Sequence, residues 1–282
     1  MKSAWMLVAG FLFAWMGAFI KLSSEYFSTT ELIFYRSFIG LLLIAPVIVM
    51  RHLPLKTPNW RLHVARSFFG MTGMVMFFTC LSLLPLATAM TLNQTAPLFL
   101  LVLTALFLQT PIFLRQVIGI FLGFASILLL LGPSISDGYS FTWLLGLGSG
   151  FAGGLVFLMV RQLSERGEPE WRVVFYFSFI TSCVSGVWAL LANNWHTWTL
   201  ESGALLIGLA LSGTLGQLAM TRAYRTGQVL IVGALNYSTV IFSALLGIML
   251  WGDLIPWTGW VAICLFVVSG VLSLRSQAGS KA

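Results

Sequence analysis

Long apolar runs alternate with short polar breaks along the whole chain. A helix needs roughly 20 apolar residues to cross the hydrocarbon of a bilayer, and the runs predict about ten such helices. The breaks between them carry turn residues such as Pro54, Pro58 and Gly252. The pattern therefore predicts an all-α membrane protein. The ten expected transmembrane helices occupy residues 4–22, 30–50, 64–83, 87–108, 116–131, 143–162, 171–192, 202–222, 229–251 and 256–274.

The composition excludes a soluble fold. Hydrophobic residues make up 59% of the 282 residues and charged residues only 8%, whereas a soluble domain carries roughly 25% charged residues. Ten spans use roughly 200 residues, which leaves room for short loops and none for a separate soluble domain. We interpret the first apolar run as the first span, because it lacks a convincing small-residue cleavage site.

Lysine and arginine segregate to one side of this predicted topology. The opposite side holds Lys21 as its only cation, and Arg36 falls inside the second span. By the positive-inside rule we expect a multi-pass protein of the inner (plasma) membrane with both termini in the cytoplasm. The formal charge of +7 follows from these flanks, which form no continuous basic surface for nucleic acid. The cations expected on the cytoplasmic side are Lys2, Arg51, Lys56, Arg61, Arg66, Arg115, Arg161, Arg166, Arg172, Arg222, Arg225, Arg275 and Lys281.

The second half of the chain repeats the first. FYRSFI at residues 34–39 matches FYFSFI at residues 175–180, an offset of 141 residues, and Leu92-Asn93 matches Leu235-Asn236 at an offset of 143. Each half holds five predicted spans, an odd number, so the halves must cross the membrane in opposite directions. Two inverted five-helix repeats are typical of secondary transporters, whose site lies near the midplane between the halves. We therefore divide the chain into residues 1–138 and 139–282.

Three segments carry a recognisable pattern, namely LSLLPLATAMTLNQTAPLFLLVLTALFL (residues 81–108), AYRTGQVLIVGALNYSTVIFSALLGIMLWGD (residues 223–253) and FYRSFIG (residues 34–40). They resemble the EamA-type family of the drug/metabolite transporter superfamily. The resemblance covers nearly the whole chain and implies ten helices, a cavity between the two repeats, and export or exchange of small organic solutes. This chain departs from the family pattern at Val240, where proline is common, and at Asp253, where glutamate is common. Val240 removes one expected helix break.

Several polar residues inside the predicted spans are candidates for substrate binding. Arg36 lies within the second span, where a charge is costly; it either holds an anionic group of the substrate, pairs with an acid or reaches outward to the interface. Asn93 and Asn236 occupy equivalent places in the two halves and either line a cavity or bridge helices by hydrogen bonds. Further candidates near these positions or in neighbouring spans are Gln94, Tyr237, Gln217 and Trp15.

Motifs of enzymes and of resident metals are absent from the sequence. There is no Walker A sequence, HExxH or GxSxG. Cys80, Cys183 and Cys264 lie far apart without CxxC spacing, which favours free buried thiols over a disulfide or a metal site. We therefore predict no cofactor, no bound metal, no enzyme activity and no ATP-driven pump.

The function predicted from these observations is secondary transport of a small organic metabolite by alternating access, as an exporter or exchanger. Arg36 favours an anionic or zwitterionic substrate. No acid lies centrally in a span, so we expect facilitated diffusion or exchange, or proton coupling through Glu31 at most. Two alternatives remain open, a lipid flippase and a non-transporting membrane scaffold. A homodimer in the lipid bilayer also remains open.

Overall fold

The computed structural model describes residues 2–108, 114–131, 140–192, 195–226, 232, 235–254 and 256–275. These residues form helices and connecting turns, and contain no strand. The boundary between the two predicted repeats, at residues 138/139, lies outside the described residues. So does the expected start of the ninth span at Val229. The helices are η1 (Lys2–Ala4), α1 (Trp5–Ser23), α2 (Thr29–Met50), α3 (Trp60–Leu83), α4 (Leu86–Asn93), α5 (Ala96–Leu108), α6 (Leu114–Leu131), α7 (Ser140–Glu165), α8 (Glu170–Leu191), α9 (Leu200–Thr226), α11 (Ser238–Trp251) and α12 (Trp257–Arg275).

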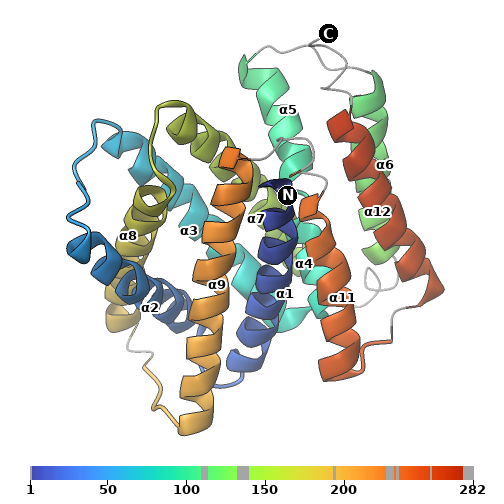
Figure 1. Ribbon diagram of the computed structural model, residues 1–282. Helices are drawn as coiled ribbons and strands as arrows, with labels where there is room; N and C mark the ends of the chain where they lie inside the picture. The colour runs from blue at the N-terminus through green and yellow to red at the C-terminus, as the bar shows by residue number, and fades with distance from the viewer. Residues whose placement is uncertain are drawn as a thin grey trace.

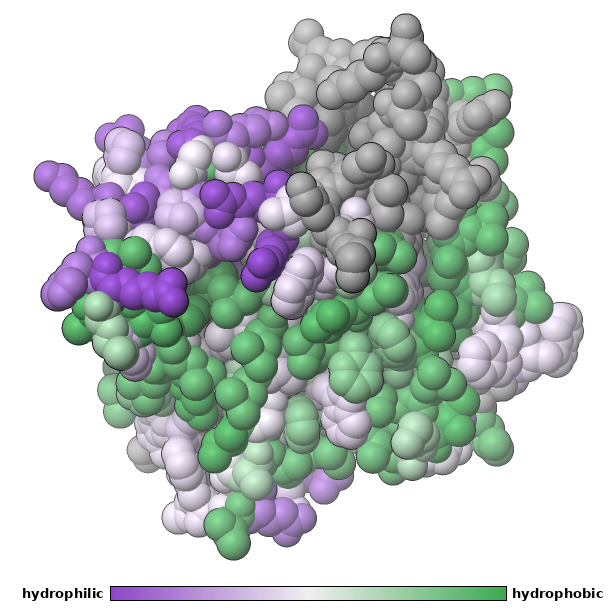
Figure 2. All heavy atoms as spheres, viewed as in Figure 1, coloured by the Kyte–Doolittle hydropathy of each residue, from purple (hydrophilic) through white to green (hydrophobic). Residues whose placement is uncertain are grey.

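Six of the described helices are long and apolar enough to cross a membrane, namely α1, α2, α3, α7, α8 and α9. Two shorter apolar stretches lie at residues 238–251 and 257–269. Large apolar side chains are exposed on these helices, including Leu42, Val49, Phe68 and Leu190. Figure 2 shows the result on one face, where a broad hydrophobic belt separates hydrophilic regions at its two ends. Such a belt suits lipid rather than water, which confirms the expected all-helical membrane protein.

Local sequence determines where the helices begin and end. The α2 helix starts with a capping box, in which Glu31 N donates to Ser28 Oγ (3.4 Å) and Ser28 N donates to Glu31 Oε2 (2.8 Å). The α8 helix starts directly after Pro169, and α11 ends at Trp251, directly before Gly252, whose φ of 64° is left-handed. Glycine adopts this conformation without steric cost. Local sequence therefore accounts for these three helix ends.

The fourth predicted span is wrong in one respect, because residues 87–108 do not form one continuous helix. The chain is interrupted at Gln94 and Thr95, between α4 and α5. Pro97 has no N–H to donate to the carbonyl of Asn93, so the ladder of hydrogen bonds cannot continue. Thr95 Oγ1 instead donates to Leu92 O (2.6 Å), and Leu98 N donates to Thr95 O (2.9 Å) to start α5.

The second half breaks at the matching place. The α11 helix begins at Ser238, two residues before Val240. The expectation that Val240 removes this break is therefore wrong, since the interruption forms without a proline. Discontinuous helices at corresponding positions of two halves are typical of transporter binding sites.

The helices pack in pairs, and each pair corresponds to a pair in which the first and second halves of the chain have changed places. The α1 helix packs against α9 and α11, and α7 packs against α3 and against the α4–α5 segment. The α2–α8 and α6–α12 pairs each join equivalent helices of the two halves, and α4 of the first half packs against α11 of the second. Figure 1 shows α2 and α8 at one edge of the bundle and α6 beside α12 at the opposite edge. Helices α1, α3, α7 and α9 lie between these two pairs.

One end of the bundle joins the loop after α2 to the loop before α8. Arg166 Nη1 donates to Asn59 Oδ1 (3.1 Å), and Arg172 Nη2 donates to Pro54 O (2.8 Å). The end of α9 reaches the same region through Arg225, which lies 3.3 Å from Glu170. This end is rich in exposed cations. They are Arg51, Lys56, Arg61, Arg161, Arg166, Arg222 and Arg225.

The other end joins the start of α2 to the loop after α8. His196 N donates to Glu31 Oε1 (2.7 Å), and His196 Nδ1 lies 2.8 Å from Glu31 Oε2. Lys21 lies at the end of α1, where its Nζ donates to Leu84 O (3.3 Å) and lies 4.9 Å from the centre of the Trp251 ring. The cations are thus segregated in space as well as in sequence.

Candidate functional site

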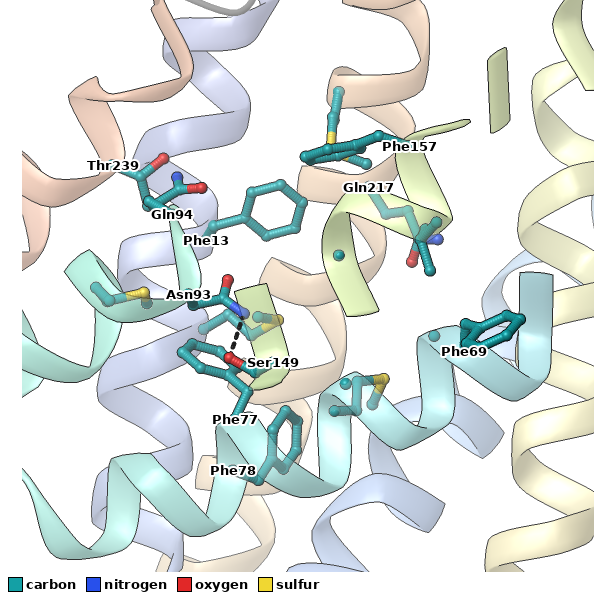
Figure 3. A pocket seen from close by; sticks show the side chains of 18 of the residues that line it. Phe13, Phe69, Phe77, Phe78, Asn93, Gln94, Ser149, Phe157, Gln217 and Thr239 are labelled. Atoms are coloured by element: carbon teal, nitrogen blue, oxygen red, sulfur yellow. Dashed lines mark hydrogen bonds between the residues drawn. The ribbon is translucent and has the colours of Figure 1, made fainter. Parts of the chain in front are cut away.

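A cavity of about 180 Å³ lies between the two halves of the bundle. Helices α1, α2, α3, α7, α8 and α9 contribute to its wall, together with the ends of α4 and α11 where the chain is broken. Figure 3 shows Asn93 and Gln94 on one side of Phe13, and Gln217 on the other. The lining residues are Phe13, Met16, Arg36, Arg66, Phe69, Gly70, Gly73, Met74, Phe77, Phe78, Met90, Asn93, Gln94, Ser149, Gly153, Val156, Phe157, Phe177, Gln217, Met220, Asn236 and Thr239.

Amide side chains meet where the two broken helices approach each other. Gln94 and Asn236 exchange hydrogen bonds, with Asn236 Nδ2 donating to Gln94 Oε1 (3.0 Å) and Gln94 Nε2 donating to Asn236 O (3.1 Å). Asn93 Nδ2 donates to Ser149 Oγ (3.1 Å) of α7, as Figure 3 shows. Asn93 is half-buried, while Gln94 and Asn236 are buried. The two equivalent asparagines therefore reach the same cavity, where their amides can both donate and accept hydrogen bonds.

Arg36 is the first of two arginines in the cavity wall. Only 7% of the residue is exposed, and its Nη2 donates to Gln217 Oε1 (3.0 Å) of α9. Its Nε has no hydrogen-bond partner in the described structure. Gly213 of α9 makes room for this side chain, because a Cβ there would lie 3.1 Å from Arg36 Nε. The α2–α9 packing thus holds a guanidinium group against the cavity.

Arg66 is the second, and the sequence prediction placed it with the cytoplasmic flank. The structure buries it on α3 with 3% exposure, and it lines the same cavity. Its guanidinium carbon lies 3.8 Å from the centre of the Phe177 ring, and the guanidinium carbon of Arg36 lies 5.5 Å from that centre. The Nε and Nη1 atoms of Arg66 lack hydrogen-bond partners among the described residues. The sequence prediction started this helix at Val64, whereas α3 starts at Trp60. Arg66 therefore lies about one helical turn further from the start of the helix than predicted.

Two of the predicted site residues do not line the cavity. Trp15 is half-buried on α1 and packs between Phe11 and Phe19, with ring centres 6.5 and 5.7 Å away. Tyr237 is 1% exposed and packs edge-on against Phe266 (5.2 Å between ring centres). Arg36, Asn93, Gln94, Asn236 and Gln217 do line it.

The acidic residues of the described chain lie outside the cavity wall. Glu31 is held at one end of the bundle by Ser28 and His196. At the other end Glu168 accepts from Thr57 Oγ1, from Asn59 Nδ2 (2.9 Å) and from Arg172 Nη1 (2.8 Å). The cavity is therefore positively charged, with its cations unneutralised by described acids.

The Glu168 carboxylate lies in the loop between α7 and α8, and its surroundings favour the charged form. Burial acts to raise its pKa, but hydrogen bonds from Asn59, Thr57 and Arg172 and the charge of Arg172 outweigh burial and lower the pKa to about 2. This carboxylate stays ionised at physiological pH. Its contacts fasten the loop after α2 to the start of α8.

The helical fold and the polar cavity define an integral membrane protein built to hold a small solute. The chain belongs to the EamA-like transporter family, whose sequence profile matches residues 2–132 and 140–275. It is thus a transporter of small metabolites rather than an enzyme.

Relatives and a solved structure extend the match over most of the chain. An uncharacterized transporter of Helicobacter pylori is 27% identical over 274 residues, which cover 94% of this chain and 92% of the relative. The pseudopaline exporter CntI of Pseudomonas aeruginosa is 28% identical over 252 residues, which cover 88% and 86%. A solved crystal structure aligns with a TM-score of 0.73 over 99% of both chains at 18% identity, a likeness of fold alone.

Proposed function

We propose that the chain is a secondary carrier that exports or exchanges a small anionic or zwitterionic metabolite across the inner (plasma) membrane. The observation that carries this proposal is the buried guanidinium of Arg36. It lines the cavity, donates to Gln217 (3.0 Å) and has no acidic partner among the described residues. A buried charge is costly unless it is paired. A carboxylate or phosphate of the substrate supplies the missing partner.

The substrate contacts that we propose come from both halves. Arg36 holds the acidic group, and Gln217 orients both the arginine and the solute. Asn93 and Gln94 provide neutral donors and acceptors on the other side of Phe13 (Figure 3), and Asn236, which is hydrogen-bonded to Gln94, adds a third amide. Tyr237 and Trp15 support this wall from behind. Tyr237 packs on Phe266, and Trp15 of α1 packs against the hydrophobic core. An amide-lined side and a cationic side suit a solute with one acidic end and other polar groups.

Alternating access in this proposal uses residues 1–138 and 139–282 as inverted five-helix repeats. Support comes from the helix contacts, because a contact between two helices has a counterpart between the corresponding helices of the other half, as α1–α9 has in α7–α3. Further support comes from the clusters around Glu31 and Glu168, which fasten α2 and α8 at opposite ends of the bundle. Opening the cavity toward one end of the bundle requires the contacts of the cluster at that end to break, while the cluster at the opposite end stays intact. Rocking of one repeat against the other around a fixed site is the expected motion.

Exchange or facilitated diffusion is the proposed energetic mode. A proton-coupled carrier needs a titratable group near its site, and no Asp or Glu within the described ranges lines the cavity. Glu31 is occupied by Ser28 and His196. Export is the favoured direction because a relative covering most of the chain is named an exporter.

A lipid flippase and a non-transporting scaffold are the competing functions. Convergence of eight polar side chains on one cavity between the halves favours the carrier, since neither alternative requires a polar central site. The expected orientation has both termini and the cation-rich end in the cytoplasm.

The experiment that tests the proposal is a panel of radiolabelled small solutes applied to proteoliposomes. We expect uptake of at least one carboxylate- or phosphate-bearing solute above the level of protein-free liposomes. Scrambling of labelled lipid without uptake of any solute would support the flippase instead. No flux of either kind would support the scaffold.

A further inference from the structure

We infer that the cavity recognises a small solute with two negative charges, which are bound by Arg36 and Arg66 beside the Phe177 ring. This inference rests on the proposed function for the idea of a transported solute, and it adds the charge class of that solute. One unpaired arginine in a membrane cavity can be neutralised by one acidic group of the solute. Two unpaired arginines in the same cavity need two acidic groups.

Neither arginine is neutralised within the described part of the chain. Of the eight acidic residues, all but Asp137 are described, and no described carboxylate lies within 4.0 Å of either guanidinium. The acids that form ion pairs are taken by other cations, Glu168 by Arg172 at 2.8 Å and Glu170 by Arg225 at 3.3 Å. Arg36 and Arg66 therefore keep their full charges at the cavity.

The two charges converge on one aromatic ring. The guanidinium carbons lie 5.5 Å (Arg36) and 3.8 Å (Arg66) from the centre of the Phe177 ring. A ring face attracts a cation but supplies no negative charge or hydrogen-bond acceptor of carboxylate strength. Phe177 thus positions the two guanidinium groups without neutralising them.

Three donor atoms remain unused after the protein contacts are counted. Arg36 Nε, Arg66 Nε and Arg66 Nη1 are buried and lack partners among the residues that the structure describes. Hydrogen bonds from a charged guanidinium group to a carboxylate or phosphate are strong. Arg66 offers Nε and Nη1, which lie on different edges of its guanidinium group, and Arg36 offers Nε while its Nη2 is held by Gln217 (3.0 Å).

Glycines on two helices keep this region open. A Cβ at Gly70 of α3 would lie 2.8 Å from Phe177 Cε2 and 3.6 Å from Arg66 Nη1. A Cβ at Gly213 of α9 would lie 3.1 Å from Arg36 Nε. Gly70 and Gly213 are equivalent in the repeat, at an offset of 143 residues. The same position in each half therefore leaves space beside one guanidinium.

The cavity limits the size of the solute. Its volume of about 180 Å³ is below the roughly 300–1,000 Å³ of pockets for drug-sized ligands. A short dicarboxylate or a phosphate monoester carries two negative charges within such a space. The shared chemistry is two anionic charges on one small organic solute, and the two sources are distinguished in the test.

The test is thermal stabilisation of the full-length chain in detergent by matched pairs of sodium salts at constant ionic strength. Succinate is compared with butyrate, and glycerol 3-phosphate with dimethyl phosphate, so that each dianion is matched with a monoanion. We expect one dianion to bind at least about tenfold more tightly than its matched partner, as loss of a charge-assisted contact predicts. Succinate alone identifies a dicarboxylate site, and glycerol 3-phosphate alone identifies a phosphate site. Equal binding within both pairs, or the same stabilisation by chloride, overturns the inference.

Variants assign the selectivity to the two arginines. In Arg36→Gln and in Arg66→Gln the preference for the dianion should fall at least about tenfold, because only one positive charge remains. Arg36→Lys and Arg66→Lys keep both positive charges, so these variants should bind more weakly but retain the preference for the dianion. They provide a second measurement if a glutamine variant misfolds. Arg161→Gln, on the exposed surface, is the control and should leave the preference unchanged. An unchanged preference in both glutamine variants contradicts the inference.

This binding measurement can fail separately from the proposed function. Selective binding of a dianion without any flux in proteoliposomes would refute transport and leave the inference standing. Transport of a monoanion or zwitterion without preference for a dianion would refute the inference and leave the carrier standing.

Discussion

At the scale of single residues, buried charges in this chain fall into two groups. Glu31 and Glu168 are surrounded by donors at the two ends of the bundle. Arg36 and Arg66 lie in the cavity with donor atoms unused. A buried charge with a full set of partners serves the fold, whereas one without them is a candidate for function. This difference separates the fastening clusters from the proposed binding site.

Glu168→Gln should destabilise the chain by about 1–3 kcal/mol at pH 7. The pKa of Glu168 in the folded chain is about 2, below its ordinary value of 4.5. Its charge therefore contributes stability that is fully present above pH 4.5 and is lost as the pH falls toward 2. Thermal unfolding in detergent should show a large difference between parent and variant at pH 7 and a smaller one at pH 3.

The matched control is Glu165→Gln. Glu165 is 61% exposed and pairs with Arg161 one helical turn away. Such surface pairs contribute roughly 0.3–0.5 kcal/mol, so the control should melt close to the parent at both pH values. A difference between parent and Glu168→Gln that is the same at pH 7 and pH 3 would show that the carboxylate charge is not the cause.

At the scale of helices, the sequence predicted which segments are helical, but not where one of them breaks. Apolar runs are strong signals because only a helix satisfies the backbone in lipid. The break at Gln94 and Thr95 depends on Pro97 and on local hydroxyl contacts, which average hydropathy does not resolve. The break in the second half forms beside Val240, where no proline marks it.

The same reasoning explains which cavity residues were found. Asn93 and Asn236 were found because amides inside apolar runs stand out and the repeat pairs them. Arg66 was missed because a cation six residues after the start of a helix resembles a membrane flank until the packing is known. Tyr237 was included because it neighbours Asn236 in sequence, although its side chain packs toward Phe266.

Gly150→Ala should destabilise the contact between α7 and the broken α4–α5 segment by about 1–3 kcal/mol. A Cβ at Gly150 would lie 2.0 Å from Thr95 Oγ1 and 2.9 Å from Leu92 O, and the backbone carbonyl cannot move freely. Gly203→Ala on α9 is the control, because its Cβ would meet only Trp198 Cε3 at 3.9 Å. Melting in detergent should show the control equal to the parent or up to about 1 kcal/mol more stable. An equally stable Gly150→Ala would contradict the close packing at this break.

At the scale of the whole molecule, side-chain contacts fasten both ends of the bundle, and a charged cavity lies between the two halves. The cation-rich end contains the loops after α2 and before α8, and the opposite end contains Lys21 and His196. Positive charge favours the cytoplasmic side. The cations of the described helices are thus distributed unevenly between the two ends of the bundle. This distribution predicts how the chain is oriented across the membrane.

Reporter fusions should place both termini in the cytoplasm. Alkaline phosphatase fused after Ala282 should be inactive, and a green fluorescent protein at the same point should fluoresce. Phosphatase inserted between Ser134 and Ser140 should be active, since that loop is expected on the outer side. A phosphatase signal from the C-terminal fusion would reverse the orientation.

The most direct test of the central claim is counterflow in proteoliposomes with the solute that the radiolabelled panel identifies. Vesicles preloaded with unlabelled solute should take up labelled solute transiently without a proton gradient. Arg36→Ala should reduce this flux at least about tenfold while the variant remains folded, and Arg36→Lys should restore only part of it, because a point charge replaces a two-pronged donor. Arg161→Ala, an exposed position, should behave as the parent. Normal counterflow by Arg36→Ala, or flux that requires a proton gradient, would contradict the account.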